Sequence, residues 1–163
     1  MAVPLNLTIP LKQDPQSQAA LQQLAASFSE TLQGPIDKAL AESRIVHFAR
    51  VLVITENQRA RYLQVLTEFD GDPEGYTEFF RQELGSVFEK IFAFAEGAPP
   101  WEELNTREAF FEYTHDLNLK SLGTSTNADD DRGYLFSGVG DKTVRELCPE
   151  VRPNDGDRLA DAA

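Results

Sequence analysis

The chain has 163 residues, 41% of them apolar, which suits a single domain with a sizeable core. Its 27 acidic residues outnumber 15 basic ones, and the net charge of −12 argues against nucleic acid or an anionic membrane as a partner. The one cysteine, Cys148, excludes an internal disulfide and a multi-cysteine metal site, and it favours a cytoplasmic location.

The N-terminal stretch predicts a strand followed by a helix. Apolar residues alternate with polar residues and proline over residues 5–11, which is the period of a strand with one buried face. Neither this stretch nor any other resembles a signal peptide or reaches the roughly 20 apolar residues of a membrane span. Asp14 and Pro15 form a helix-start signal, and apolar residues then recur at helical spacing to Leu32. Gly34-Pro35 should interrupt this helix, with a shorter helical segment over residues 36–41.

A β-hairpin and a long helix are predicted next. Residues 46–54 are β-branched and almost continuously apolar, as in a central strand that is covered on both faces. Residues 55–60 are polar and form the turn, and residues 62–69 form the returning strand. Asp72-Pro73 repeats the helix-start signal, and aromatic and aliphatic residues follow at spacings of three and four up to residue 92.

The C-terminal part predicts shorter elements. Residues 101–119 have the pattern of another helix, and residues 121–133 form a polar loop. A short strand is predicted over residues 134–137, followed by helical turns over residues 141–147 with Asp141 as the cap. We therefore expect one domain over residues 1–150 and a flexible acidic tail over residues 151–163.

The order of these elements indicates the fold class. Without the inserted helix at residues 101–119 it is βαββαβ, the ferredoxin-like α+β arrangement, with an antiparallel sheet and helices on one face. The pattern does not decide which sheet face the helices bury. The other face is apolar enough to call for a partner, and a second copy of the chain is the simplest one, so we expect a homodimer.

Three segments carry a family resemblance: "VHFARVLVI", "YLQVLTEFDGD" and "GYLFSGVGDKTVREL". Over residues 45–150 the chain resembles the dimeric α+β barrel superfamily, which includes dye-decolourising peroxidases, chlorite dismutases and small cofactor-free monooxygenases. It is most similar to a bacterial family of such domains associated with peroxidase- and catalase-related proteins. The resemblance implies the fold more than an activity, because the chain carries no haem-ligand motif of those enzymes.

Two residues of the first hairpin strand are candidate ligand-binding residues. His47 shares a strand face with Ala49, Val51 and Val53, where it could line a pocket, ligate haem or pack against the backbone. Arg50 points to the opposite face and needs a carboxylate or solvent. Glu68 on the returning strand is the expected partner, and an anionic ligand is the alternative.

His115 is the third candidate, and it lies on the predicted helix. Glu112 and His115 form a Glu-x-x-His pair, but the sequence holds no second such pair, so we predict no metal site. His115 is either a surface residue or the proximal ligand of a haem. Asp70, Asp72 and Glu74 resemble the start of a calcium loop, although helix capping explains Asp72, and residues 129–131 form a solvated acidic run.

These features favour a homodimeric accessory module that binds a small apolar ligand. The alternative is a haem-dependent peroxidase-like or cofactor-free oxidoreductase that uses His47 or His115 together with Arg50. The sequence identifies neither a substrate nor a physiological partner.

Overall fold

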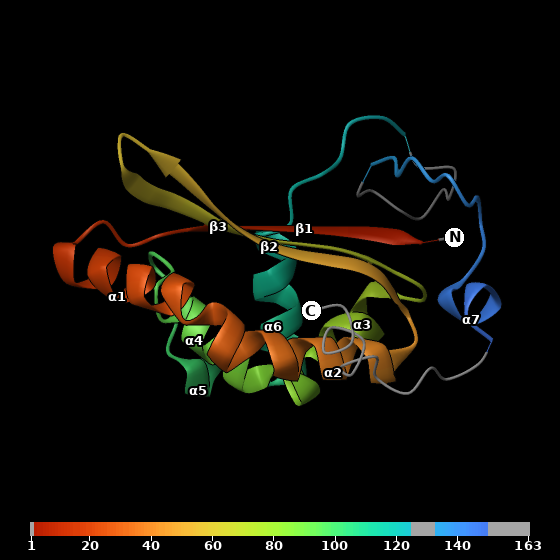
Figure 1. Cartoon of the computed structure of the whole chain (residues 1–163), viewed down its shortest axis with the longest axis horizontal. Helices are drawn as coiled ribbons and strands as arrows, with labels where there is room; N and C mark the ends of the chain where they lie inside the picture. The colour runs from red at the N-terminus through yellow and green to blue at the C-terminus, as the bar shows by residue number, and fades with distance from the viewer. Residues whose placement is uncertain (1, 125–132, 150–163) are drawn as a thin grey trace, which may run out of the picture.

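The computed structural model describes residues 2–124 and 133–149. In this part of the chain the fold is α+β, with a three-stranded antiparallel sheet and helices against one of its faces (Figure 1). Strands β1 (Val3–Pro10) and β2 (Val46–Glu56) flank the central strand β3 (Arg59–Phe69). None of the described helices is long and apolar enough to cross a membrane.

Strands β2 and β3 form the predicted hairpin, with Val51 paired to Val65 near its middle. The strands extend beyond the expected bounds, so that the turn is reduced to Asn57 and Gln58. Both residues have positive φ angles, of 49° and 64°. This is the backbone of a type I′ turn, whose twist matches that of the flanking strands.

The pleat of the sheet separates a buried face from an uncovered one. Leu7, Ile9 and Val65 are buried beneath the helices. On the other face, which we call the open face, large apolar side chains are exposed: Phe48 by 73%, Leu52 by 41%, Ile54 by 40% and Tyr62 by 42%. The prediction that residues 46–54 form a central strand covered on both faces is therefore wrong. Strand β2 lies at a sheet edge, and the described helices cover only one face of the sheet.

Helices α1 (Pro15–Ala26) and α2 (Gly34–Ser43) connect β1 to β2 and are joined by a π-helical turn, η1 (Ser29–Gln33). The predicted cap is confirmed, since Asp14 accepts a hydrogen bond of 2.8 Å from the backbone N–H of Ser17. Gly34 does not interrupt the helical backbone, because its own φ of −59° is helical. Pro35 instead places the irregularity in the preceding turn, because it has no N–H to donate to an α-helical partner.

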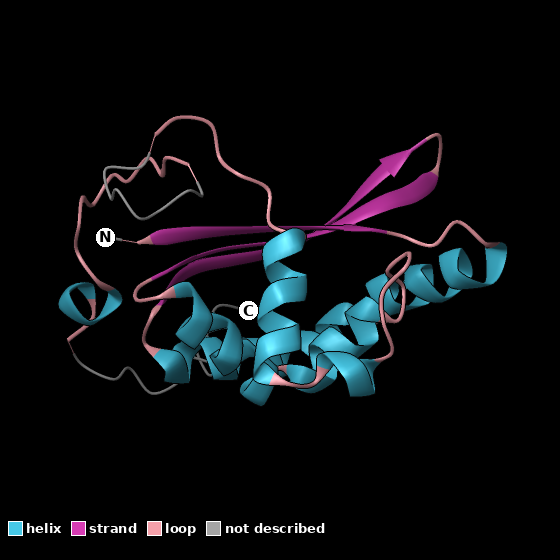
Figure 2. Ribbon diagram, turned by 180° about the vertical axis from the view of Figure 1, so that it is seen from behind, coloured by secondary structure: helices cyan, strands magenta, loops and turns pink. Residues whose placement is uncertain are grey.

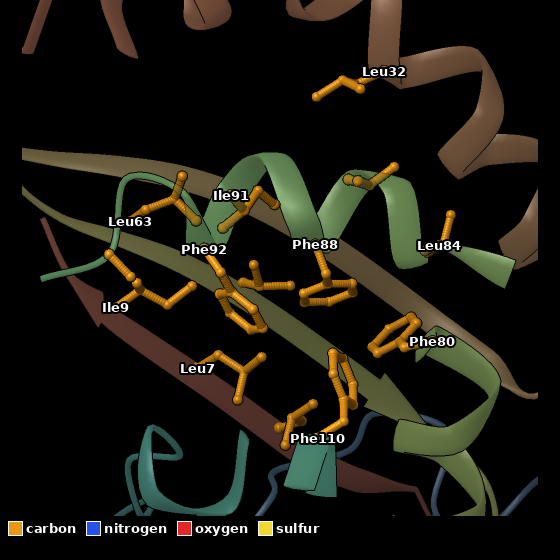
Figure 3. Packing of buried hydrophobic residues seen from close by; sticks show 14 of the residues in the cluster. Leu7, Ile9, Leu32, Leu63, Phe80, Leu84, Phe88, Ile91, Phe92 and Phe110 are labelled. Atoms are coloured by element: carbon orange, nitrogen blue, oxygen red, sulfur yellow. The ribbon is translucent and has the colours of Figure 1, made fainter. Parts of the chain in front are cut away.

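The predicted aromatic helix is present as two helices, α3 (Pro73–Glu83) and α4 (Gly85–Phe92). Asp72 caps α3 by accepting a hydrogen bond of 2.7 Å from the backbone N–H of Gly75. The helix breaks at Leu84, next to Gly85, since glycine disfavours a helix interior. The rings of Phe80, Phe88 and Phe92 lie against the buried face of the sheet, as Figure 3 shows.

The predicted helix over residues 101–119 is also divided, into α5 (Trp101–Leu104) and α6 (Arg107–Asp116). Thr106 begins α6 by accepting a hydrogen bond of 3.2 Å from the backbone N–H of Ala109. Residues 117–119 then leave the helix and run along the free edge of β1. There Thr8 donates to the carbonyl of Leu117, and Leu119 donates to that of Asn6, both at 2.9 Å.

This pairing replaces the fourth strand of the predicted βαββαβ order. Residues 134–137 have no regular structure, so the described chain forms the first split β-α-β half but not the second. In the ferredoxin-like order a fourth strand would pair with β1. That edge is occupied by residues 117–119, and by residues 94–96, which bond to Pro10 and Lys12 at 2.8 and 2.9 Å.

Candidate functional site

A pocket of about 430 Å³ lies at one end of the sheet, on its open face. One wall comes from the beginning of β2 and the end of β3, and the other from residues 135–139. Figures 1 and 2 show the described segments after α6, residues 120–124 and 133–143, lying on the side of the sheet opposite the helix layer, near the beginning of β1. The lining residues are Ala2, His47, Phe48, Ala49, Arg50, Glu68, Leu135, Phe136, Ser137, Gly138 and Val139.

His47 reaches its partner through an irregularity in β2. The pairing with β3 shifts between Val46 and Phe48, so His47 is the extra residue of a β-bulge. Its Nε2 lies 2.9 Å from Oδ1 of Asp70, and the two side chains are only 8% and 11% exposed. We expected a packed histidine to bond to a backbone group, but in the structure its partner is the carboxylate of Asp70. Nδ1 of His47 has no hydrogen-bond partner among the described residues.

Asp70 also anchors the short helix that follows the far wall of the pocket. Its Oδ2 accepts a hydrogen bond of 2.6 Å from the backbone N–H of Val144, and its own N–H donates to the carbonyl of Ile45 at 2.7 Å. Val144 is the first residue of the short helix α7 (Val144–Leu147). A second anchor is Arg44, whose guanidinium donates to the carbonyl of Cys148 at 2.9 Å.

The cap of α7 differs from the prediction. Thr143, and not Asp141, is the N-cap, because Thr143 and Glu146 form a reciprocal capping box. The two hydrogen bonds from Thr143 hold the pKa of the Glu146 carboxyl below its usual range. Together with Asp70, this box fixes where the helix begins.

Arg50 and Glu68 both line the pocket, but they do not form the predicted ion pair. The register pairs Phe48 with Glu68 and Arg50 with Leu66, so the two charged residues are diagonal neighbours on adjacent strands. Among the described residues Arg50 has no carboxylate partner, and Glu68 has no cationic partner. An arginine that is exposed can remain hydrated, so the sheet does not require this pairing.

His115 lies elsewhere, on α6, and its side chain is 61% exposed. It borders a separate surface depression of about 330 Å³ with Phe111, Glu112 and Asp116, and Asp116 is 3.9 Å away. The structure therefore does not bring His115 together with His47 and Arg50. Within residues 2–124 and 133–149, no cluster of three metal-ligand side chains is present.

The acidic residues that resemble the start of a calcium loop have other partners. Asp70 bonds to His47 and Val144, and Asp72 caps α3. Glu74 pairs with Arg107 on α6 at 3.0 Å. The acidic run at residues 129–131 and the predicted tail at residues 151–163 lie outside the described residues.

The arrangement favours recognition of a polar ligand. His47 has one ring nitrogen committed to Asp70, which leaves Nδ1 for a ligand or a metal. Haem binding through His47 or His115 stays a prediction. Sequence reasoning missed Asp70 and Phe136 as site residues, since neither a bulge nor the return of residues 134–139 to β2 has a local sequence signal.

Comparison with known proteins does not identify this site. No family model, no curated protein and no solved structure matches the chain at the significance required for a match.

Proposed function

We propose that the chain is an accessory domain that binds a small ligand in the pocket beside β2 and acts as a homodimer. The observation that carries ligand binding is the pocket itself. Its volume of about 430 Å³ falls in the range of small-molecule sites, and it combines apolar and aromatic walls with a few polar groups.

The part of the pocket around His47 is held in place before any ligand arrives. Asp70 fixes the His47 ring in one wall and the start of α7, which follows the other wall in the chain, and Arg44 holds the end of α7. A site with fixed walls loses less conformational freedom on binding. This supports binding of a specific small molecule.

The fluorescent aromatic sulfonate 8-anilino-1-naphthalenesulfonate is a suitable first probe, because it combines an anionic group with apolar rings. Titration should give a saturable rise in fluorescence, and Phe136→Ala should weaken binding about tenfold by removing an aromatic wall. Leu122→Ala is the matched control, since Leu122 is 91% exposed and lies outside both the open face and the pocket lining. Equal affinity of the wild type and Phe136→Ala would contradict binding in this pocket.

The open face supports the homodimer. Leu52, Ile54 and Tyr62 are neighbours on β2 and β3, and Phe48 continues the same face toward the pocket. An exposed apolar sheet face of this kind favours association, and a second copy offers the same apolar surface. The split β-α-β arrangement of β1, β2 and β3 supports the proposal that the chain belongs to the dimeric α+β barrel superfamily.

Light scattering coupled to gel filtration tests the dimer. At micromolar concentration the mass should be about twice the chain mass of 18.2 kDa, and Leu52→Arg should reduce it to that of a monomer. Leu122→Arg is the control, because Leu122 is 91% exposed and lies outside β2 and β3. A wild-type protein that is monomeric at these concentrations would exclude this assembly.

A further inference from the structure

We propose that the ligand of this pocket is a zwitterionic aromatic compound of the free amino-acid class. Its carboxylate would bind Arg50, its ammonium group Glu68, and its ring the aromatic side chains of the walls. This inference rests on the proposed function, because it names the ligand class of the same pocket.

The charged groups of the pocket differ in whether they already have partners. His47 and Asp70 are bonded to each other through Nε2 and Oδ1, and the second oxygen of Asp70 is bonded to Val144. Arg50 and Glu68 have no ion-pair partner among the described residues, although both line the pocket. The pocket therefore offers one cation and one anion, placed diagonally on adjacent strands.

A single-charge ligand would satisfy only one of these two groups. A simple anion would neutralise Arg50 but would lie close to Glu68, and it would also be repelled by a chain of net charge −12. A simple cation would pair with Glu68 but would desolvate Arg50 without a partner. A zwitterion satisfies both charges and has no net charge of its own. The arrangement thus favours a zwitterion over either singly charged class.

The aromatic part of the ligand follows from two exposed rings. Phe48 on β2 is 73% exposed and Phe136 on the opposite wall is 87% exposed, although both line the pocket. Phe136 is held edge-on against Tyr134, with ring centroids 4.8 Å apart and an interplanar angle of 73°. A ligand ring between these walls would remove apolar surface from water and gain aromatic contacts.

Three small probes separate the contributions of the two charges. L-phenylalanine carries both groups, 3-phenylpropionate lacks the ammonium group, and 2-phenylethylamine lacks the carboxylate. Isothermal titration calorimetry should show that the wild-type protein binds L-phenylalanine at least about tenfold more tightly than either analogue, the effect of one lost charge-assisted hydrogen bond.

Two substitutions then assign each group to its residue. Glu68→Gln should remove the preference for L-phenylalanine over 3-phenylpropionate, and Arg50→Gln should remove the preference over 2-phenylethylamine. Arg59→Gln is the control, because it removes an exposed arginine at the hairpin turn, outside the pocket lining, and should leave both ratios unchanged. Circular dichroism of each variant verifies that the fold is retained.

The outcomes distinguish this inference from the proposed function. If 3-phenylpropionate binds as tightly as L-phenylalanine and Glu68→Gln leaves both affinities unchanged, the proposal of a zwitterionic ligand is wrong, while the pocket remains a ligand site. The same conclusion follows if only the sulfonate probe binds and its affinity depends on Phe136. If none of the four probes binds in a manner that depends on Arg50, Glu68 or Phe136, both proposals fail.

Discussion

Asp70 joins three segments of the chain, and its replacement by alanine provides a quantitative test of the site. Asp70→Ala removes the acceptor of two hydrogen bonds, one of 2.9 Å to Nε2 of His47 and one of 2.6 Å to the N–H of Val144. A hydrogen bond to a charged group contributes about 1.5–3 kcal/mol when its partner remains buried. Because the Asp70 and His47 side chains are only 11% and 8% exposed, we expect the free energy of unfolding to fall by about 3 kcal/mol.

Urea unfolding followed by far-ultraviolet circular dichroism measures this loss. A double-mutant cycle with His47→Gln should give a coupling energy of at least about 1 kcal/mol, since the two side chains are in direct contact. Asp116→Ala is the matched control, because the Asp116 side chain is 85% exposed, and its effect should stay within about 0.5 kcal/mol. A loss below about 0.5 kcal/mol for Asp70→Ala, or no coupling to His47, would refute the structural role given to this carboxylate.

Three further predictions concern the core and the cofactor. Phe88 is 2% exposed and its ring contacts those of three other phenylalanines. Phe88→Ala should therefore lower the free energy of unfolding, measured in urea, by about 3–5 kcal/mol. The control for Phe88→Ala is Phe48→Ala, on the open face, which should lower the free energy of unfolding of the monomer by less than about 0.5 kcal/mol. Burial raises the pKa of the Tyr76 phenol far above its ordinary value of about 10, so the folded chain favours the neutral form. This contribution to stability is complete below pH 10 or so and is lost as the pH rises further, at about 1.4 kcal/mol per pH unit. The difference in unfolding free energy between the wild type and Tyr76→Phe should therefore change with that slope above pH 10 or so, and parallel curves would contradict it. The proposed accessory module should give no saturable Soret band in a haem titration, whereas a band that is lost in His47→Ala or His115→Ala would favour the oxidoreductase instead.

The parts of the fold that the sequence predicts correctly are those with local signals. Alternation of apolar residues identified β1, and the two Asp-Pro pairs identified the beginnings of α1 and α3. The hairpin was predicted from two apolar runs around a short polar turn. In each case the residues that determine the structure lie within a few positions of one another.

The errors arise where distant segments compete for the same place. The apolar pattern of β2 shows that the strand is hydrophobic, but not that a neighbouring layer covers only one of its faces. Residues 134–137 form no strand, and residues 117–119 pair with β1 at the edge where a fourth strand would lie; no local pattern reveals that arrangement. The contact between His47 and Asp70 is similar, since the two residues are 23 positions apart and meet only through a bulge.

The outer edge of β1 is occupied, and this affects how copies of this protein can associate. Residues 94–96 and 117–119 occupy its outer hydrogen-bonding groups, so within the described chain β2 is the only strand whose outer edge could accept a foreign strand. If two molecules pair edge to edge along β2, each occupies the only free strand edge that the described part of the other offers. Strand addition then terminates at a pair and cannot continue into a fibre.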